Sequence, residues 1–114
     1  MADSTTTIAT LREAARRFND ERNWEQFHSP KNLAMGMACE AAEIMEHFLW
    51  LDAEQSRQAM RDPVKLAAVG EEVADVAVYL LNMANVLGLD LSDTIAAKMV
   101  KNAIKYPPPG EPGA

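Results

Sequence analysis

Two pairs of acidic residues, spaced three positions apart within each pair, are the residues of this sequence best suited to chemistry. The pairs are Glu40 with Glu43 and Glu72 with Asp75. On a helix, the members of each pair lie about 60° apart and therefore share one side. If both pairs face a common interface, burial and mutual repulsion oppose their ionised forms unless a cation is present. The spacing is thus compatible with a divalent metal site built by two helices.

The same spacing is also typical of a solvated helix face, and from the pattern alone the two interpretations stand level. Oxygen ligands suit Mg²⁺ or Mn²⁺. Because Mg²⁺ commonly shares its coordination sphere with substrate phosphates, the first interpretation indicates phosphate chemistry.

Helical periodicity and capping signals predict the elements that must position these pairs. Ser29-Pro30 and Asp62-Pro63 each combine a capping side chain with a first-turn proline. We expect long helices over about 7–22, 29–50, 63–88 and 90–105, with a short helical piece within 52–62. The sequence therefore predicts an all-α, compact, four-helix-bundle-like domain over residues 1–107, followed by a flexible Pro/Gly-rich tail over 108–114.

Charge and composition exclude several classes of protein. The chain has 17 acidic and 11 basic residues, and a net charge of -6 opposes binding to a nucleic acid polymer. No apolar run approaches the roughly 18 residues that cross a bilayer, so we expect no membrane partner. Cys39 is the single cysteine, and the first residues lack a secretory apolar core. A cytoplasmic location is therefore expected.

Five short segments carry a resemblance to a known family. They are ERNWEQFHSPKNL at 21–33, EAAE at 40–43, FLW at 48–50, EEVAD at 71–75 and KMVKNAIKYP at 98–107. Together they resemble the MazG-like, all-α nucleotide pyrophosphohydrolases, and within that superfamily the dCTP pyrophosphatase branch. The resemblance spans roughly residues 11–107.

The resemblance implies a set of metal ligands and an assembly. The E-x-x-E and E-x-x-D motifs would hold Mg²⁺ through Glu40, Glu43, Glu72 and Asp75. Glu40 or Glu43 would accept the proton of the attacking water. The family also implies a homo-oligomer, commonly a homotetramer arranged as a dimer of dimers, with each site lined partly by a neighbouring subunit.

Substrate contacts are implied by the same resemblance. Trp24 and Trp50 would hold the base by stacking. His28 and Asn32 are nearby polar candidates, although Asn32 could equally bond local backbone. Contacts to the phosphates would come from Lys98, Asn102, Lys105 and Tyr106, although basic residues here also complement the helix dipole.

Other residues near the motifs leave more than one interpretation open. Glu46 and Glu71 lie on neighbouring faces of their helices, turned away from the two pairs. They are expected either to be solvated or to contact the metal ligands indirectly. His47 and Tyr79 follow Glu40 and Glu72 by seven positions and could either bond a ligand carboxylate or lie at the core edge. Ala15 stands where animal dCTP-specific members carry histidine, which leaves the preferred base open.

The sequence therefore predicts a Mg²⁺-dependent enzyme that hydrolyses a nucleoside triphosphate to the monophosphate and pyrophosphate. The expected substrate is dCTP or a related or modified pyrimidine dNTP. Within the superfamily, a dUTP- or phosphoribosyl-ATP-type pyrophosphohydrolase is the alternative. Outside it, the alternative is a non-catalytic helical bundle that binds a divalent metal or a partner. A ferritin-like di-iron site is disfavoured because neither Glu43 nor Glu72 is followed by histidine at the required offset.

Overall fold

The computed structural model describes residues 1–110, which form helices and turns and contain no strand. The elements are α1 (Ile8–Glu21), the short 3₁₀ helix η1 (Glu25–Phe27), α2 (Pro30–Glu46), α3 (Ala53–Ala59), α4 (Pro63–Leu87) and α5 (Leu91–Lys105). The predicted all-α class is confirmed. Of the predicted tail over 108–114, residues 111–114 lie outside the described part of the chain.

The three longest helices begin at the predicted positions, and each start is capped by a side chain. Ser29 Oγ accepts a hydrogen bond from the backbone N–H of Asn32 at 3.1 Å. Asp62 and Asp90 likewise accept from backbone N–H groups at the starts of α4 and α5. Gly88 ends α4 in the left-handed conformation (φ 65°), which glycine adopts without steric cost.

Helix α2 ends at Glu46, four residues before the predicted end. The N–H groups of His47 and Phe48 bond the carbonyls three residues before them, at 3.2 and 3.0 Å. This tighter pattern replaces the α-helical ladder and leads into a turn at 47–50. The apolar periodicity continues through Phe48, and for that reason the sequence suggested a longer helix.

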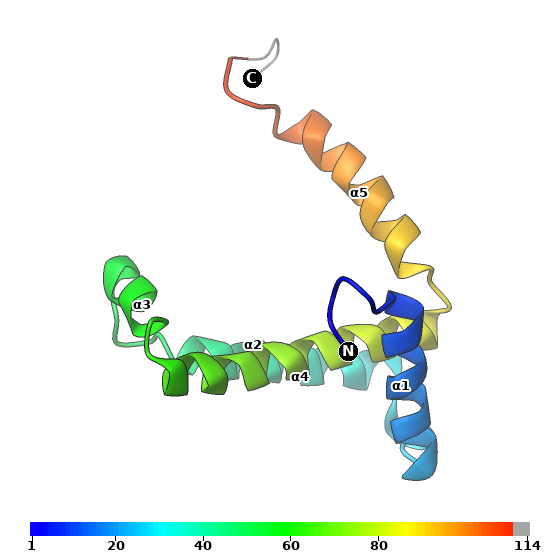
Figure 1. The fold of residues 1–114 in the computed structure, drawn as a ribbon. Coiled ribbons are helices and arrows are strands. Elements are labelled where there is room, and N and C mark those ends of the chain that lie inside the picture. The colour runs from blue at the N-terminus through cyan, green and yellow to red at the C-terminus, as the bar shows by residue number, and fades with distance from the viewer. Residues whose placement is uncertain (111–114) are drawn as a thin grey trace.

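Helices α2 and α4 lie side by side along most of their length and form the centre of the fold (Figure 1). Leu33 is the most enclosed large side chain, at 1% exposure. Gly36 of α2 faces the ring of Tyr79 on α4 so closely that a Cβ atom at position 36 would overlap the ring. The glycine therefore sets the close approach of the two helices.

Helix α1 is fastened across the C-terminal half of α4 (Figure 1). The Arg12 guanidinium donates to Asn85 Oδ1 at 2.8 Å and to the carbonyls of Ala84 and Leu89 at 3.2 and 2.5 Å. Asn85 Nδ2 donates back to the Arg12 carbonyl at 3.1 Å. Arg12 thus fastens α1 to the last turn of α4 and to Leu89, the residue that follows the Gly88 cap.

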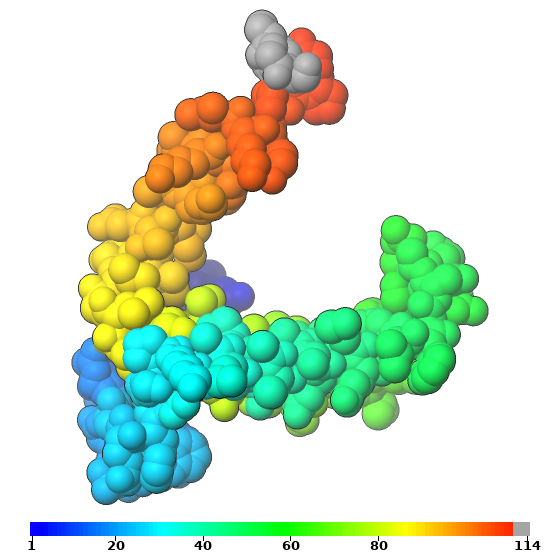
Figure 2. Space-filling view, turned by 180° about the vertical axis from the view of Figure 1, so that it is seen from behind, coloured from blue at the N-terminus to red at the C-terminus, as the bar shows by residue number. Residues whose placement is uncertain are grey.

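Helix α5 departs from the other helices, and the chain bends by 102° between α4 and α5. Within residues 1–110, α5 packs against no other helix to an extent comparable with α1 or α2. Figure 2 shows the resulting open shape, in which α5 and α3 project from the two ends of the α2–α4 pair. The compact bundle expected from the sequence is therefore not closed by α5 within one chain.

The dimensions of the chain reflect this open shape. Its radius of gyration is 17.4 Å, whereas about 13 Å is typical of a compact domain of this length. Its accessible surface is 8686 Å², roughly 2,500 Å² more than a compact monomer of 12.5 kDa exposes. Much of α5's apolar surface faces outward: Ile95, Met99, Val100 and Ile104.

In the part of the chain that the structure describes, no single helix has the length and apolarity needed to cross a bilayer. Helices α4 and α5 reach that length and composition only when taken together across their bend.

Candidate functional site

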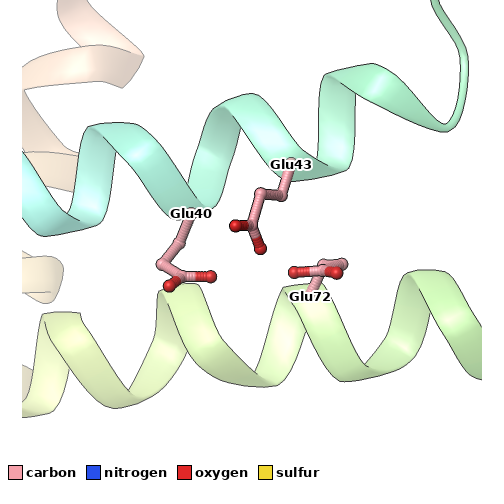
Figure 3. Close-up of side chains that lie close together, drawn as sticks. All are labelled: Glu40, Glu43 and Glu72. Atoms are coloured by element: carbon pink, nitrogen blue, oxygen red, sulfur yellow. The ribbon is translucent and has the colours of Figure 1, made fainter.

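Three of the four predicted metal ligands converge between α2 and α4. Glu40 and Glu43 extend from α2 toward Glu72 on α4 (Figure 3). Each residue offers a carboxylate oxygen that lies within 4.8 Å of those of the other two. This convergence follows from the packing of α2 on α4, because each helix presents its acidic shoulder at the shared interface.

The carboxylates lack the positive partners that usually accompany buried charge. Glu40 Oε2 and Glu72 Oε2 are enclosed and form no hydrogen bond. None of the salt bridges among residues 1–110 involves Glu40, Glu43 or Glu72. Enclosed oxygens without a donor are costly unless a cation is bound, so the donor set fits a hard divalent ion.

The crowding of these groups also changes their protonation. A hydrogen bond with Glu43, burial, and neighbouring negative charges raise the pKa of Glu72 from 4.5 to about 7. Burial, followed by the charge of Glu43 and a hydrogen bond with it, raises the pKa of Glu40. Asp75 adds repulsion at both carboxyl groups. At neutral pH the metal-free site therefore holds part of a proton that a bound cation would displace.

Asp75, the fourth predicted ligand, lies outside the tight group of three but one turn from Glu72 on α4. Its carboxylate borders a cavity of about 540 Å³ between α1, α4 and the loop that follows α1. This volume lies in the range of small-molecule sites. The acidic cluster and the cavity therefore adjoin each other at Asp75.

The cavity has one aromatic side formed by Trp24 and Phe18. Their rings meet edge to face, with centroids 5.5 Å apart. Asn23 has a positive φ of 55°, which turns the chain so that the Trp24 N–H bonds the carbonyl of Asn19 at 3.0 Å. Trp24 is 42% exposed and is thus held in place while retaining an accessible face.

A single stripe of residues on α4 runs from the acidic cluster to Asn82 in the cavity lining. Glu72, Asp75, Tyr79 and Asn82 follow one another at intervals of three or four residues, so they share one helix face. The stripe spans about 15 Å along the helix. A ligand with a charged end and a flat apolar end can therefore lie along it.

His28 and Asn32 occupy different positions relative to this cavity. His28 is half-buried and lines it. Asn32 Nδ2 donates to the Phe27 carbonyl at 2.9 Å, the local backbone bond that the sequence left open as its alternative. Asn32 therefore braces η1 against the start of α2.

Trp50 and the α5 residues are not brought to this site within one chain. Trp50 follows α2, whereas Trp24 precedes it, and the 17 residues of α2 separate them by about 25 Å. Trp50 is 89% exposed. The diverging α5 (Figure 1) and its C-cap residue carry the predicted phosphate contacts away from the carboxylates: Lys98, Asn102 and Lys105 in the helix and Tyr106 at the cap.

The remaining predicted neighbours lie at the margins of the site. Glu46 and Glu71 are exposed, and His47 is exposed at the C-terminal end of α2. Tyr79 is half-buried, with its ring against Gly36 and its side chain in the cavity lining. Tyr79 thus connects the helix interface to the cavity.

Sequence reasoning did not single out Asn19 and Asn82, which both line the cavity and are 5% and 6% exposed. Asn19 Nδ2 donates to Asn82 Oδ1 at 2.9 Å. Asn19 follows Ala15 by one turn on the apolar side of α1, and Asn82 interrupts an apolar run in α4. The signal that could have identified them is a polar amide at a position where the helical pattern predicts an apolar core residue.

Comparisons with known proteins agree with this architecture. Residues 37–113 match the model of the MazG-like family. The chain is 39% identical to dCTP pyrophosphatase 1 of Rattus norvegicus over 102 residues, which cover 89% of this chain and 59% of that protein. The Homo sapiens dCTP pyrophosphatase 1 is 37% identical, with the same coverage of both chains. The chain therefore belongs to the MazG-like family, and the predicted resemblance is confirmed.

A solved structure extends the comparison to the fold. A pyrophosphatase from Archaeoglobus fulgidus superimposes with a TM-score of 0.81 at 33% identity, covering 95% of this chain and 99% of that one. By contrast, the chain spans about three-fifths of the length of the curated dCTP pyrophosphatases it matches. The helical arrangement is thus shared along nearly the whole chain with the archaeal protein.

Proposed function

We propose that this protein is a divalent-metal-dependent nucleoside triphosphate pyrophosphohydrolase acting on dCTP or a related or modified pyrimidine dNTP. The observation that carries the proposal is a cluster of carboxylates with unpartnered oxygens next to a cavity that has an aromatic side. The names of the similar proteins, dCTP pyrophosphatase 1 and pyrophosphatase, support the same chemistry.

Glu40, Glu43, Glu72 and Asp75 would hold Mg²⁺ or Mn²⁺. When bound, the ion supplies positive charge that stabilises the negative charge developing on the phosphates. Glu40 or Glu43 accepts the proton of the water that attacks the triphosphate, since a carboxylate oxygen not used for ligation remains basic. Asp75 lies where the acidic cluster meets the cavity, and it aligns the phosphates with the nucleoside.

Trp24 provides a face on which the base stacks. The length of the α4 stripe suits a nucleotide bound with its phosphates near Glu72 and its base near Asn82. The similarity to dCTP pyrophosphatases favours a pyrimidine nucleotide over the phosphoribosyl-ATP type of substrate.

The working form in this proposal is a homo-oligomer, with a dimer of dimers as its expected arrangement. The excess surface of roughly 2,500 Å² per chain is what an obligate interface buries. Association would cover the apolar side of α5 and allow a neighbouring subunit to supply Trp50 and the α5 residues. The phosphate contacts expected of Lys98, Asn102, Lys105 and Tyr106 would then be made between subunits.

The test is pyrophosphate release from a panel of canonical and modified dNTPs, with and without Mg²⁺. We expect release only with the metal. Glu43→Gln should abolish turnover while leaving the helical circular dichroism spectrum unchanged, because it removes a ligand charge at nearly constant volume. Glu46→Gln, one turn further along α2 on an exposed face, is the matched control and should retain activity.

Two outcomes would contradict the proposal. Unchanged turnover in Glu43→Gln would refute the assignment of the metal site. Silence across the whole panel, combined with Mg²⁺ binding measured by calorimetry, would favour a non-catalytic metal-binding bundle instead.

A further inference from the structure

The lining of the cavity includes a pair of buried amides that the proposed chemistry does not use. Asn19 on α1 and Asn82 on α4 meet through the 2.9 Å hydrogen bond described above. Both side chains are more than nine-tenths buried, and both line the cavity that also contains Trp24. The pair lies two to three turns along α4 from Glu72, at the opposite end from the acidic cluster.

Each amide retains one polar atom that the pair does not use. Within residues 1–110, Asn19 Oδ1 and Asn82 Nδ2 form no hydrogen bond. The fully enclosed unpartnered side-chain atoms of the described chain are those of Glu40 and Glu72, so the free amide atoms remain reachable from open space. The pair also borders a smaller cavity of about 150 Å³. An acceptor and a donor on two largely buried side chains therefore lie together, accessible to a ligand and without a protein partner.

We propose that Asn19 and Asn82 read the hydrogen-bonding edge of the base, and that the pair accepts amino and keto pyrimidines alike. This inference rests on the proposed function. Cytosine offers an amino donor at C4 beside the N3 acceptor, which match Asn19 Oδ1 and Asn82 Nδ2. Uracil offers the reverse, a C4 carbonyl beside an N3–H donor.

A joint rotation of both amides reverses the pattern that the pair presents. If Asn82 Nδ2 donates to Asn19 Oδ1, the internal hydrogen bond is preserved and the free atoms become Asn19 Nδ2 and Asn82 Oδ1. No hydrogen bond to the rest of the described chain opposes that rotation, because the side-chain amides bond only each other. The pair therefore complements uracil in one state and cytosine in the other.

Asn85 is the internal comparison for this argument. It lies three residues after Asn82 on α4, but its Oδ1 accepts from Arg12 and its Nδ2 donates to the Arg12 carbonyl. Both polar atoms are thus committed to fastening α1, and Asn85 is fixed in one orientation. A purely structural role for Asn19 and Asn82 would be expected to produce the same complete pairing.

The experiment compares dCTP, dUTP and 3-methyl-dUTP, in which a methyl group replaces the N3 proton. We expect the wild-type kcat/KM for dCTP and dUTP to agree within about tenfold, and 3-methyl-dUTP to be poorer than dUTP by roughly tenfold to a hundredfold. The double variant Asn19→Leu, Asn82→Leu should lose this preference for dUTP over 3-methyl-dUTP. Exchanging both amides for apolar groups of similar shape leaves no buried partner unsatisfied, which favours folding.

Asn85→Ala is the control variant, expected to melt at a lower temperature while keeping the wild-type ratio of dUTP to 3-methyl-dUTP. Equal wild-type efficiency on these two substrates would overturn base reading without any variant. A dCTP to dUTP ratio above about a hundredfold in either direction would overturn the reversible pair, as would an unchanged dUTP to 3-methyl-dUTP ratio in the double variant.

Binding separates this inference from the proposed function. The α,β-imido analogues of the three nucleotides resist hydrolysis, and calorimetry gives their Kd ratios directly. The expected ratios in binding, together with absent turnover, would refute the hydrolase and support the base reading. Turnover without these binding ratios would support the hydrolase and refute the base reading. Absence of both binding and turnover would refute the hydrolase and the base reading together.

Discussion

Replacing Ile104 with alanine tests whether a second copy of the chain buries α5. Ile104 is 78% exposed in the isolated chain, so its apolar surface leaves water only on assembly. Burying an isoleucine side chain stabilises by about 1.5–3 kcal/mol, most of which alanine loses. With about 2 kcal/mol lost per chain, a symmetric dimer loses about 4 kcal/mol, and its Kd should rise about a thousandfold.

The assay is size-exclusion chromatography with light scattering, over protein concentrations from nanomolar to micromolar, with turnover measured at each. We expect the midpoint of dissociation to shift and activity to fall in parallel, because the α5 residues would no longer reach a neighbouring site. Lys101→Ala, on the same helix, is the control and should leave the midpoint unchanged. A wild-type chain that is monomeric and fully active at every concentration would refute the reasoning.

The remaining predictions concern the metal-free site and the helix contacts. Because the pKa of Glu72 is raised to about 7, its protonated form favours the folded state, and this contribution is lost as the pH rises from about 4.5 through 7. The metal-free protein should therefore melt at a lower temperature at pH 8 than at pH 5.5, and Glu72→Gln should reduce that difference; an equal fall in the variant would contradict it. Gly36→Ala should force the Tyr79 ring from its position, lowering both thermal stability and nucleotide affinity; an unchanged crystal structure and Kd would show that the contact adjusts freely. Arg12→Ala should lower the free energy of unfolding by about 2 kcal/mol or more, measured by urea denaturation, whereas Arg17→Ala on the exposed face of the same helix should change it little.

Local chemistry made most of the fold predictable. The caps at Ser29, Asp62 and Asp90 and the left-handed Gly88 act within a few residues of themselves, so the sequence locates the ends they control. The end of α2 has no such residue. There the turn after Glu46 competes with an apolar pattern that continues, and periodicity alone suggested the wrong end.

The parts of the site that could be predicted are those in which the residue spacing along a single helix determines which side chains share a face. The spacing of Glu40 and Glu43 determines their common face, and the packing of α2 on α4 brings Glu72 to them. The position of α5 is not determined locally, because most of its large apolar residues stay exposed in the described chain. The Asn19–Asn82 contact joins residues 63 positions apart, and each asparagine read separately resembles an ordinary polar interruption.

Helix α4 packs against α2 on one side and α1 on another, and these two contacts can change independently in evolution. Its contacts with α2 form the acidic cluster, whereas its contacts with α1 form the wall of the cavity. Substitutions at positions such as Ala15 or Asn19 alter the α1 wall and leave the α2 carboxylates in place. Under the proposed function, preference for a base can therefore change through mutations in α1 while the carboxylates of α2 and α4 are inherited intact. A family built on this scaffold can then acquire new substrates with the same chemistry.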